Sequence, residues 1–313
     1  METCHLDKIQ AYLDNNFVID CATNQPKWRA KALDARQAGL VNLVMSPWSI
    51  YEIGKASKEK MNEVIRIVDE LEPQWILERV DLQLLEFLHA WTEFWTGIRT
   101  KFDPIGTLAE VQAYFLRVDQ ERVKSYTLRD YAEVWQRRDA HREARVEFQR
   151  QANISAWNRR AYSRGKMASQ TVRDIRMRYV ARQIVMSKGR RLSQEQMAKQ
   201  EERILKSQKI WTFIRFFVEF GGLEDMKAHR VEEALTFSLW STEAALNAHR
   251  LIDRFHATAA LPYCEMFVTS DKELVKRSNR VLDELNFKIA QVLTGEDFIR
   301  HLDKLLLGKC QPS

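Results

Sequence analysis

Apolar residues form two short β-rich runs in the first part of the chain. The run IQAYL, Ile9 to Leu13, predicts a strand, and LVNLVMSP, Leu40 to Pro47, predicts a second one. The second run lacks polar–apolar alternation, which is typical of a strand buried on both faces of a parallel sheet. A helix from about Pro26 to Ala38 is expected between the strands, and a helix that carries Glu52 is expected after Pro47.

Strand patterns return only near the C-terminal end. The run CEMFVTSD, Cys264 to Asp271, follows a predicted helix over about 241–260. A helix over 272–284, a last strand within NFKIAQVLTG and a helix over 296–307 complete the series. This alternation of strands and helices predicts an α/β fold with a small parallel sheet and helices on both faces.

Between Lys58 and Gly222 the pattern is helical throughout. Apolar residues from Trp75 to Ile98 recur at helical spacing, and Thr107 is placed to cap another helix. Ser193 and Gln196 form a capping-box pattern that predicts a helix running to Phe220. The expected organisation is helix-dominated: an α/β domain in two parts, 1–56 and 240–313, interrupted by a large all-helical insertion, 57–239.

The amino-acid composition agrees with a protein rich in helices and indicates where in the cell the protein is expected. The 313 residues include 10 glycines and 6 prolines, so residues that favour turns are scarce. No apolar run approaches the roughly 18–20 residues that span a bilayer. Four scattered cysteines form no CxxC pair, which argues against a zinc site and a disulfide framework. We therefore expect a cytoplasmic protein without a membrane anchor.

Positive charge is concentrated within the predicted insertion. The chain carries a formal charge of +6, and the region 136–215 holds 21 Lys and Arg against 7 Asp and Glu. Rings such as Trp157 and Tyr162 lie among these cations, as is typical of nucleic-acid-binding surfaces. The alternatives are a solvated helix face or a surface for a protein partner or inhibitor. The candidate nucleic-acid contacts are Arg159, Arg160, Arg164, Lys166, Arg173 and Arg176.

Four acidic residues are placed where a parallel sheet gathers its functional groups. Asp14 and Asp271 each follow a predicted strand, so both are expected at the carboxyl edge of the sheet. Glu52 and Asp253 lie on helices next to these strands. Taken singly, each has an ordinary explanation as a cap or a solvated side chain. Four converging carboxylates would repel one another unless cations lie among them, which points to Mg²⁺ or Mn²⁺.

Several stretches around these acids resemble known motifs. LDNNFVID, SPWSIYEIGKA and DRFHATAALPYCEMFVTSDKEL, with the final KIAQVLTGEDFIRHL, resemble motifs of the PIN-domain nuclease superfamily. The resemblance implies a metal-dependent phosphodiesterase, usually an endoribonuclease, whose catalytic and metal-binding acids correspond to Asp14, Glu52, Asp253 and Asp271. Glu265 stands where many relatives carry Asp, and is an optional fifth acid.

In such a site, two ions about 3.5–4 Å apart would hold a water molecule and the scissile phosphate in line. We expect Asp14 to bridge the ions and Glu52 to act as a ligand or a base. Asn16 and Thr269 are expected to hold the carboxylates in place, and His256 to be a packed or solvated histidine. The alternatives are a DNA-directed nuclease of the same mechanism and a non-catalytic subunit that binds nucleic acid or assembles with other proteins.

Overall fold

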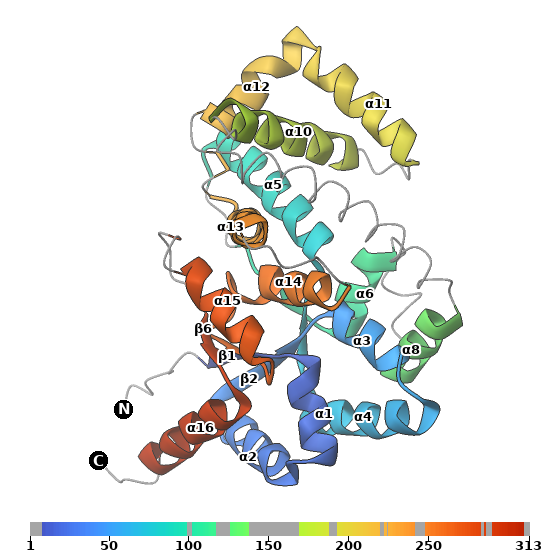
Figure 1. The fold of residues 1–313 in the computed structure, drawn as a ribbon, viewed down its shortest axis with the longest axis vertical. Coiled ribbons are helices and arrows are strands. Elements are labelled where there is room, and N and C mark those ends of the chain that lie inside the picture. Colours follow the sequence, from blue (N-terminus) through green and yellow to red (C-terminus); the bar gives the residue numbers. More distant parts are fainter. Residues whose placement is uncertain are drawn as a thin grey trace.

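The computed structural model describes residues 8–98, 102–116, 126–137, 169–187, 193–219, 222–223, 225–241, 248–282, 285 and 290–309. Arg159, Arg160, Arg164 and Lys166 lie outside these ranges, so the predictions made for them have no structural counterpart here. The described elements form an α/β architecture with one sheet and many helices (Figure 1).

The sheet has six strands in the order β4-β3-β2-β1-β5-β6. The strands are β1 Ile9–Leu13, β2 Val41–Met45, β3 Gln74–Ile76, β4 Ile105–Gly106, β5 Met266–Val268 and β6 Gln291–Leu293. β4 pairs with β3 in the antiparallel direction, and the other pairings among these strands are parallel. The predicted α/β fold with a mostly parallel sheet is confirmed at this level.

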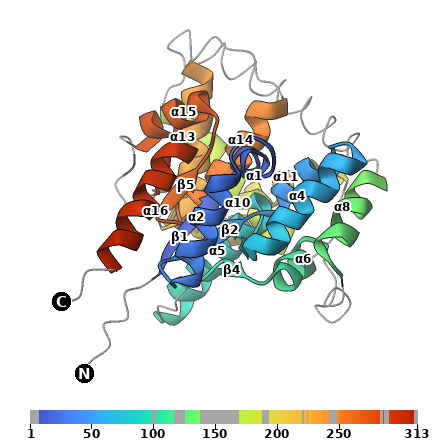
Figure 2. The same cartoon turned by 90° about the horizontal axis from the view of Figure 1, so that it is seen from below.

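Helices pack on both faces of the sheet. Around the first strands lie α1 Asn15–Thr23, α2 Pro26–Gln37, α3 Pro47–Gly54 and α4 Lys58–Leu71. Along the later part of the chain follow α13 Lys227–Ser241, α14 Ala248–Ala260, α15 Lys272–Leu282 and α16 Gly295–Lys309. Figure 1 shows α2 and α16 on one side of the sheet and α13, α14 and α15 on the other, and Figure 2 shows the same layers from below.

The middle of the chain supplies further helices and two strands. The helices are α5 Arg79–Thr96, α6 Leu108–Leu116, α8 Leu128–Arg137, α10 Ser169–Ser187, α11 Gln194–Leu205 and α12 Gln208–Glu219. The prediction that no strand lies between Lys58 and Gly222 is wrong, because β3 and β4 extend the sheet. Both are too short to show a period of two, and Trp75 and Ile76 of β3 also fit the helical spacing of α5.

Helix caps were predicted better than helix lengths. Thr107 and Glu110 exchange backbone and side-chain hydrogen bonds at the start of α6. Ser193 and Gln196 form the expected capping box at α11. The helix predicted to run from there to Phe220 is divided instead, since α11 ends at Leu205 and α12 begins at Gln208.

Among the described residues, α5 contributes to the two larger hydrophobic cores. The larger core surrounds the sheet and includes Leu82 of α5. The smaller core lies among α5, α10 and α12, where Phe87 packs against Phe217 with ring centroids 5.0 Å apart. α5 therefore connects the sheet to the helices at the upper end of Figure 1.

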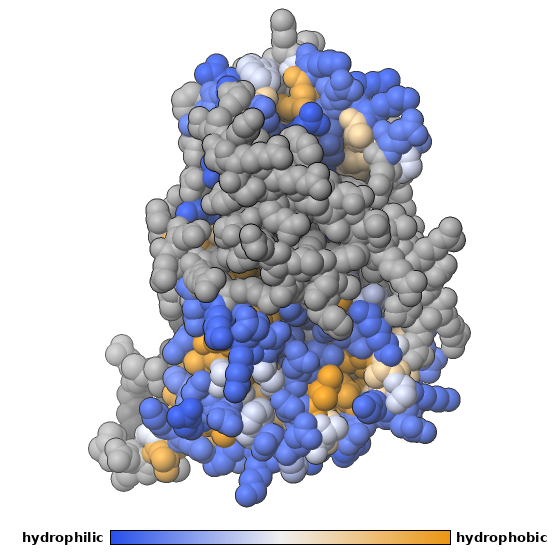
Figure 3. All heavy atoms as spheres, in the orientation of Figure 1, coloured by the Kyte–Doolittle hydropathy of each residue, from blue (hydrophilic) through white to orange (hydrophobic). Residues whose placement is uncertain are grey.

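The described surface in Figure 3 is mostly hydrophilic, with apolar residues exposed in small groups. Among the described helices, none is long and apolar enough to cross a membrane.

Candidate metal centre

Asp14 lies at the carboxyl end of the central strand β1, where the chain turns into α1. Its side chain is 3% exposed and caps that helix, because Oδ1 accepts a hydrogen bond from the backbone N–H of Asn15 at 2.8 Å. Oδ2 accepts from the hydroxyl of Thr269 at 2.8 Å and from the amide of Asn16 at 3.3 Å. Three donors therefore fix the orientation of this carboxylate, and two of them are the residues that the sequence assigned to holding it.

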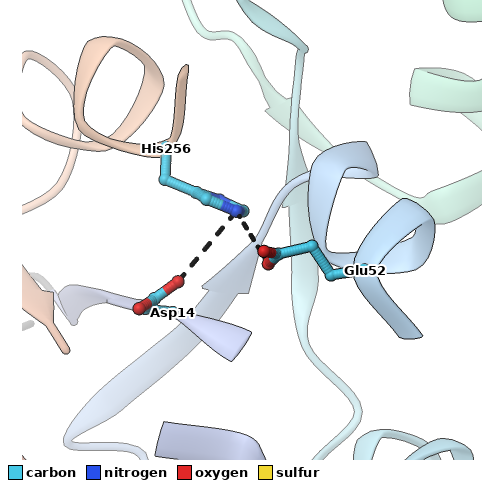
Figure 4. Close-up of side chains that lie close together, drawn as sticks. All are labelled: Asp14, Glu52 and His256. Atoms are coloured by element: carbon cyan, nitrogen blue, oxygen red, sulfur yellow. Dashed lines mark hydrogen bonds and ion pairs between the residues drawn. The ribbon is translucent and has the colours of Figure 1, made fainter. Parts of the chain in front are cut away.

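His256 and Glu52 approach Asp14 from two different helices. His256, on α14, is 1% exposed, and its Nε2 lies 3.2 Å from Oε2 of Glu52 on α3. The same nitrogen lies 4.0 Å from Oδ1 of Asp14. Figure 4 shows the three side chains pointing toward one another from the end of β1, from α3 and from α14. One ligand atom from each can be chosen so that all three lie within 4.8 Å of one another.

The other edge of the His256 ring contacts two buried hydroxyl groups. Nδ1 is hydrogen-bonded to the hydroxyl of Tyr12 and lies 3.3 Å from that of Ser46. Tyr12 in turn donates to Ser46 at 2.8 Å. Tyr12 is on β1 and Ser46 follows β2, so the two central strands hold the imidazole from behind.

Asp253 belongs to the same group by its electrostatics. The pKa of the Asp253 carboxyl is raised to about 7, chiefly by burial and also by the charges of Asp14, Asp271 and Glu52, while His256 acts in the opposite direction. The charges of the other three predicted acids therefore act on Asp253, whereas the group of ligand atoms within 4.8 Å of one another contains only Asp14, Glu52 and His256. We call Asp14, Glu52, Asp253, Asp271 and His256 together the acid cluster.

Asp271 also has a structural role within the acid cluster. Its Oδ1 accepts hydrogen bonds from the backbone N–H groups of Glu273 at 2.8 Å and Leu274 at 3.1 Å, which caps α15. The backbone N–H of Asp271 donates to Thr269 at 3.1 Å. Thr269 therefore links Asp271 to Asp14.

Glu265, the optional fifth acid, lies apart from this group. It precedes β5, and its carboxylate accepts a hydrogen bond from the backbone N–H of Gln10 at 2.6 Å. Because β5 runs parallel to β1, Glu265 is at the amino end of the sheet while Asp14 is at the carboxyl end. The structure therefore places Glu265 outside the acid cluster.

The acid cluster contains more carboxylates than positively charged groups, and the pKa shifts of its buried members reflect this excess. Burial raises the pKa of Asp14; His256 acts against this shift and Glu52 adds to it. Burial by itself lowers the pKa of His256, but its hydrogen bond to Glu52 and the charges of Glu52, Asp14 and Asp253 raise it overall. Each shift is the response of a buried site with more carboxylates than cations. Two carboxylates and an imidazole directed at a common point fit a divalent metal ion.

A second buried group of charges is compensated from within the protein. Glu232 on α13 accepts from Arg79 on α5 at 2.5 Å, lies 3.6 Å from Arg254 on α14, and also accepts from Gln83. Burial alone would raise the pKa of Glu232, yet the two arginines and Gln83 lower it overall. We call Arg79, Gln83, Glu232 and Arg254 the ion network.

The two candidate nucleic-acid contacts that the structure describes lie on α10 and form ion pairs within the protein. Arg173 pairs with Glu219. Arg176 forms a two-point contact with Glu233, through Nε at 2.8 Å and Nη2 at 2.6 Å. These pairs use part of the positive charge of α10. That the two arginines bind nucleic acid stays a prediction.

Sequence reasoning did not assign functional positions to His256, Tyr12 and Ser46. From the sequence, His256 is expected to be a packed or solvated histidine. In the structure it is packed, and its ring lies beside Glu52 and Asp14. Its position three residues after Asp253 places it on the same side of α14, and that spacing is the sequence signal that could have found it.

Comparisons with known proteins give no match: no family model, no curated protein and no solved structure matches this chain.

Proposed function

We propose that this protein is a divalent-metal-dependent nuclease with a PIN-like arrangement, and that RNA is its substrate. The observation that carries the proposal is the convergence of Asp14, Glu52 and His256, whose ligand atoms lie within 4.8 Å of one another at the carboxyl edge of the sheet. Functional sites of open α/β sheets lie at this edge. The resemblance of the segments around the four acids to PIN-domain nucleases supports the same reaction.

The side chains have distinct tasks in this proposal. Asp14, held by Asn15, Asn16 and Thr269, is a rigid ligand at the centre of the acid cluster. Glu52 and His256 are ligands from the helix side, and Asp253 and Asp271 extend the negative surface toward the substrate. A bound Mg²⁺ or Mn²⁺ ion would lower the pKa of water and neutralise the phosphate.

The basic region 136–215 is proposed to hold the nucleic acid. Its surplus of Lys and Arg attracts phosphates irrespective of base sequence. Arg159, Arg160, Arg164 and Lys166 are the proposed contacts outside the described residues. A DNA-directed nuclease and a non-catalytic subunit that binds nucleic acid or a protein partner are the rival readings of the same features.

The test is cleavage of single-stranded RNA, structured RNA and DNA by metal-stripped protein with Mg²⁺ or Mn²⁺ restored. We expect RNA cleavage that EDTA abolishes, and a loss of about a thousandfold or more in Asp14→Asn, because the central ligand loses its charge. Glu265→Gln is the matched control: it removes an acid next to the same strands but outside the acid cluster, and should cleave like the wild type.

The outcomes separate the rivals. Cleavage restricted to DNA would favour the DNA-directed enzyme. Binding of RNA without turnover, in wild type and Asp14→Asn alike, would favour the non-catalytic subunit. Full activity of Asp14→Asn would place the chemistry elsewhere in the chain.

A further inference from the structure

The donor set of the acid cluster contains a nitrogen. His256 directs Nε2 to a point flanked by Oε2 of Glu52 at 3.2 Å and Oδ1 of Asp14 at 4.0 Å. The ring is 1% exposed, so this nitrogen can reach no other polar environment without rearrangement of α14. Any cation bound between the two carboxylates therefore also meets an imidazole.

The hydroxyl of Tyr12 holds the imidazole in the form that a metal requires. A histidine that binds a metal through Nε2 carries its proton on Nδ1 and needs an acceptor there. Tyr12 lies at Nδ1 and donates its own proton to Ser46 at 2.8 Å, so its oxygen can accept from the ring. This geometry therefore allows Nδ1 to carry the proton and leaves Nε2 for a metal ion.

We propose that Asp14, Glu52 and His256 bind a first-row transition-metal ion such as Mn²⁺ in preference to Mg²⁺, with Tyr12 as the positioning residue. The proposal rests on the proposed function for its biological meaning and narrows the choice of cofactor at the same site. Mg²⁺ favours oxygen ligands alone, whereas imidazole suits transition metals and their affinities for mixed nitrogen and oxygen sites are higher.

The selectivity between two metals isolates the role of the nitrogen. We would measure Kd for Mn²⁺ and for Mg²⁺ by calorimetry on metal-stripped protein, in wild type, His256→Asn and Tyr12→Phe. Tyr131→Phe is the matched control, since Tyr131 is another buried tyrosine, on α8. A general loss of the site should weaken the binding of both metals together. Loss of the nitrogen ligand should weaken the binding of Mn²⁺ selectively.

We expect wild type to bind Mn²⁺ at least tenfold more tightly than Mg²⁺. His256→Asn should reduce that ratio to near one, mostly through weaker Mn²⁺ binding. Tyr12→Phe should weaken Mn²⁺ binding by about 10- to 100-fold, which is the usual effect of removing the hydrogen-bond partner of a metal ligand. Tyr131→Phe should leave both constants unchanged. An unchanged ratio in His256→Asn would overturn the proposal.

A measurement on wild type covers the case in which a variant does not fold. Electron spin-echo spectroscopy of Mn²⁺-loaded protein should show coupling to a directly bound imidazole nitrogen, and its absence would also overturn the proposal. The proposed function fails separately. Mg²⁺-supported RNA cleavage with no nitrogen coupling would remove only the present inference, whereas nitrogen coupling in a protein that cleaves nothing would remove only the nuclease.

Discussion

The acid cluster and the ion network are both buried, and both include residues of α14, yet a carboxyl pKa is raised in the first and lowered in the second. In the ion network, Glu232 lies between Arg79 and Arg254, and its pKa is lowered. In the acid cluster, burial together with the charges of the other carboxylates raises the pKa of Asp253 to about 7. Arg254 and Asp253 are sequence neighbours that point to different groups.

The difference separates a structural use of buried charge from a functional one. In the ion network the protein itself supplies the cations that compensate the buried carboxylate, and Glu232 connects α13 to α5 and α14. Buried carboxylates without such partners are under strain that a cation from solution can relieve. The first should therefore matter most for stability, and the second for binding.

The largest effect on stability is expected from breaking the ion network. Glu232→Gln leaves both guanidinium groups without this carboxylate, and removal of one partner from a buried ion pair typically costs about 3–5 kcal/mol. Chemical denaturation should therefore show a loss of this size. Glu202→Gln removes an exposed acid that pairs with Lys206 at 2.9 Å and should change stability by less than about 1 kcal/mol. Equal effects of the two variants would contradict the assignment.

Relieving the acid cluster should have a smaller effect of the opposite sign. The pKa of Asp253 in the folded protein is about 7, above the usual value of 3.8, so folding stability falls as the pH rises between these values. Without metal, Asp253→Asn should match wild type near pH 4 and exceed it at pH 8 by about 2–4 kcal/mol. Thermal unfolding at several pH values measures this. Saturating Mn²⁺ should remove the advantage of the variant, and a gain that is independent of pH would contradict the raised pKa of Asp253.

The smallest effect is expected at Glu86, an acid that has neither a surplus of like charges nor a matched arginine. Its Oε1 accepts from the backbone N–H of Ala228 at 2.8 Å and from the hydroxyl of Tyr263, while burial raises its pKa to about 7. Glu86→Gln keeps a carbonyl oxygen for these donors, so near pH 5, where the Glu86 carboxyl is protonated, we expect a change within about 1 kcal/mol. Stability should shift in favour of the variant as the pH rises from 5 to 8, measured as the difference in Tm. A constant difference would mean that the carboxyl titrates normally.

The long elements of the fold were predictable because their hydrophobic pattern is strong and local. β2 appeared as an unalternating apolar run, and Thr107 and Ser193 marked helix starts by their own chemistry. β3 and β4 have three and two residues, which is shorter than any periodic signal. Their pairing depends on tertiary contacts that neighbouring residues do not encode.

The site was predictable to the extent that strand ends predict it. Asp14 and Asp271 follow strands, and parallel strands bring such ends together. The role of His256 depends instead on the rotation of α14 against β1 and β2, which sets whether its ring meets Tyr12 and Glu52 or the core. Glu265 could have been excluded by the strand-end argument, because it precedes the strand whose other end leads to Asp271.

Because β1 lies in the middle of the sheet, the acid cluster is assembled from distant parts of the polypeptide. His256 follows Glu52 by 204 residues, and Thr269 follows Asp14 by 255. At a synthesis rate of roughly 5–20 residues per second, these partners leave the ribosome roughly 10–50 s after Asp14 and Glu52. A nascent chain therefore carries no complete acid cluster until Asp271, just after β5, has been translated. Under the proposed function, the candidate site would therefore be inactive until this late stage of synthesis of the chain.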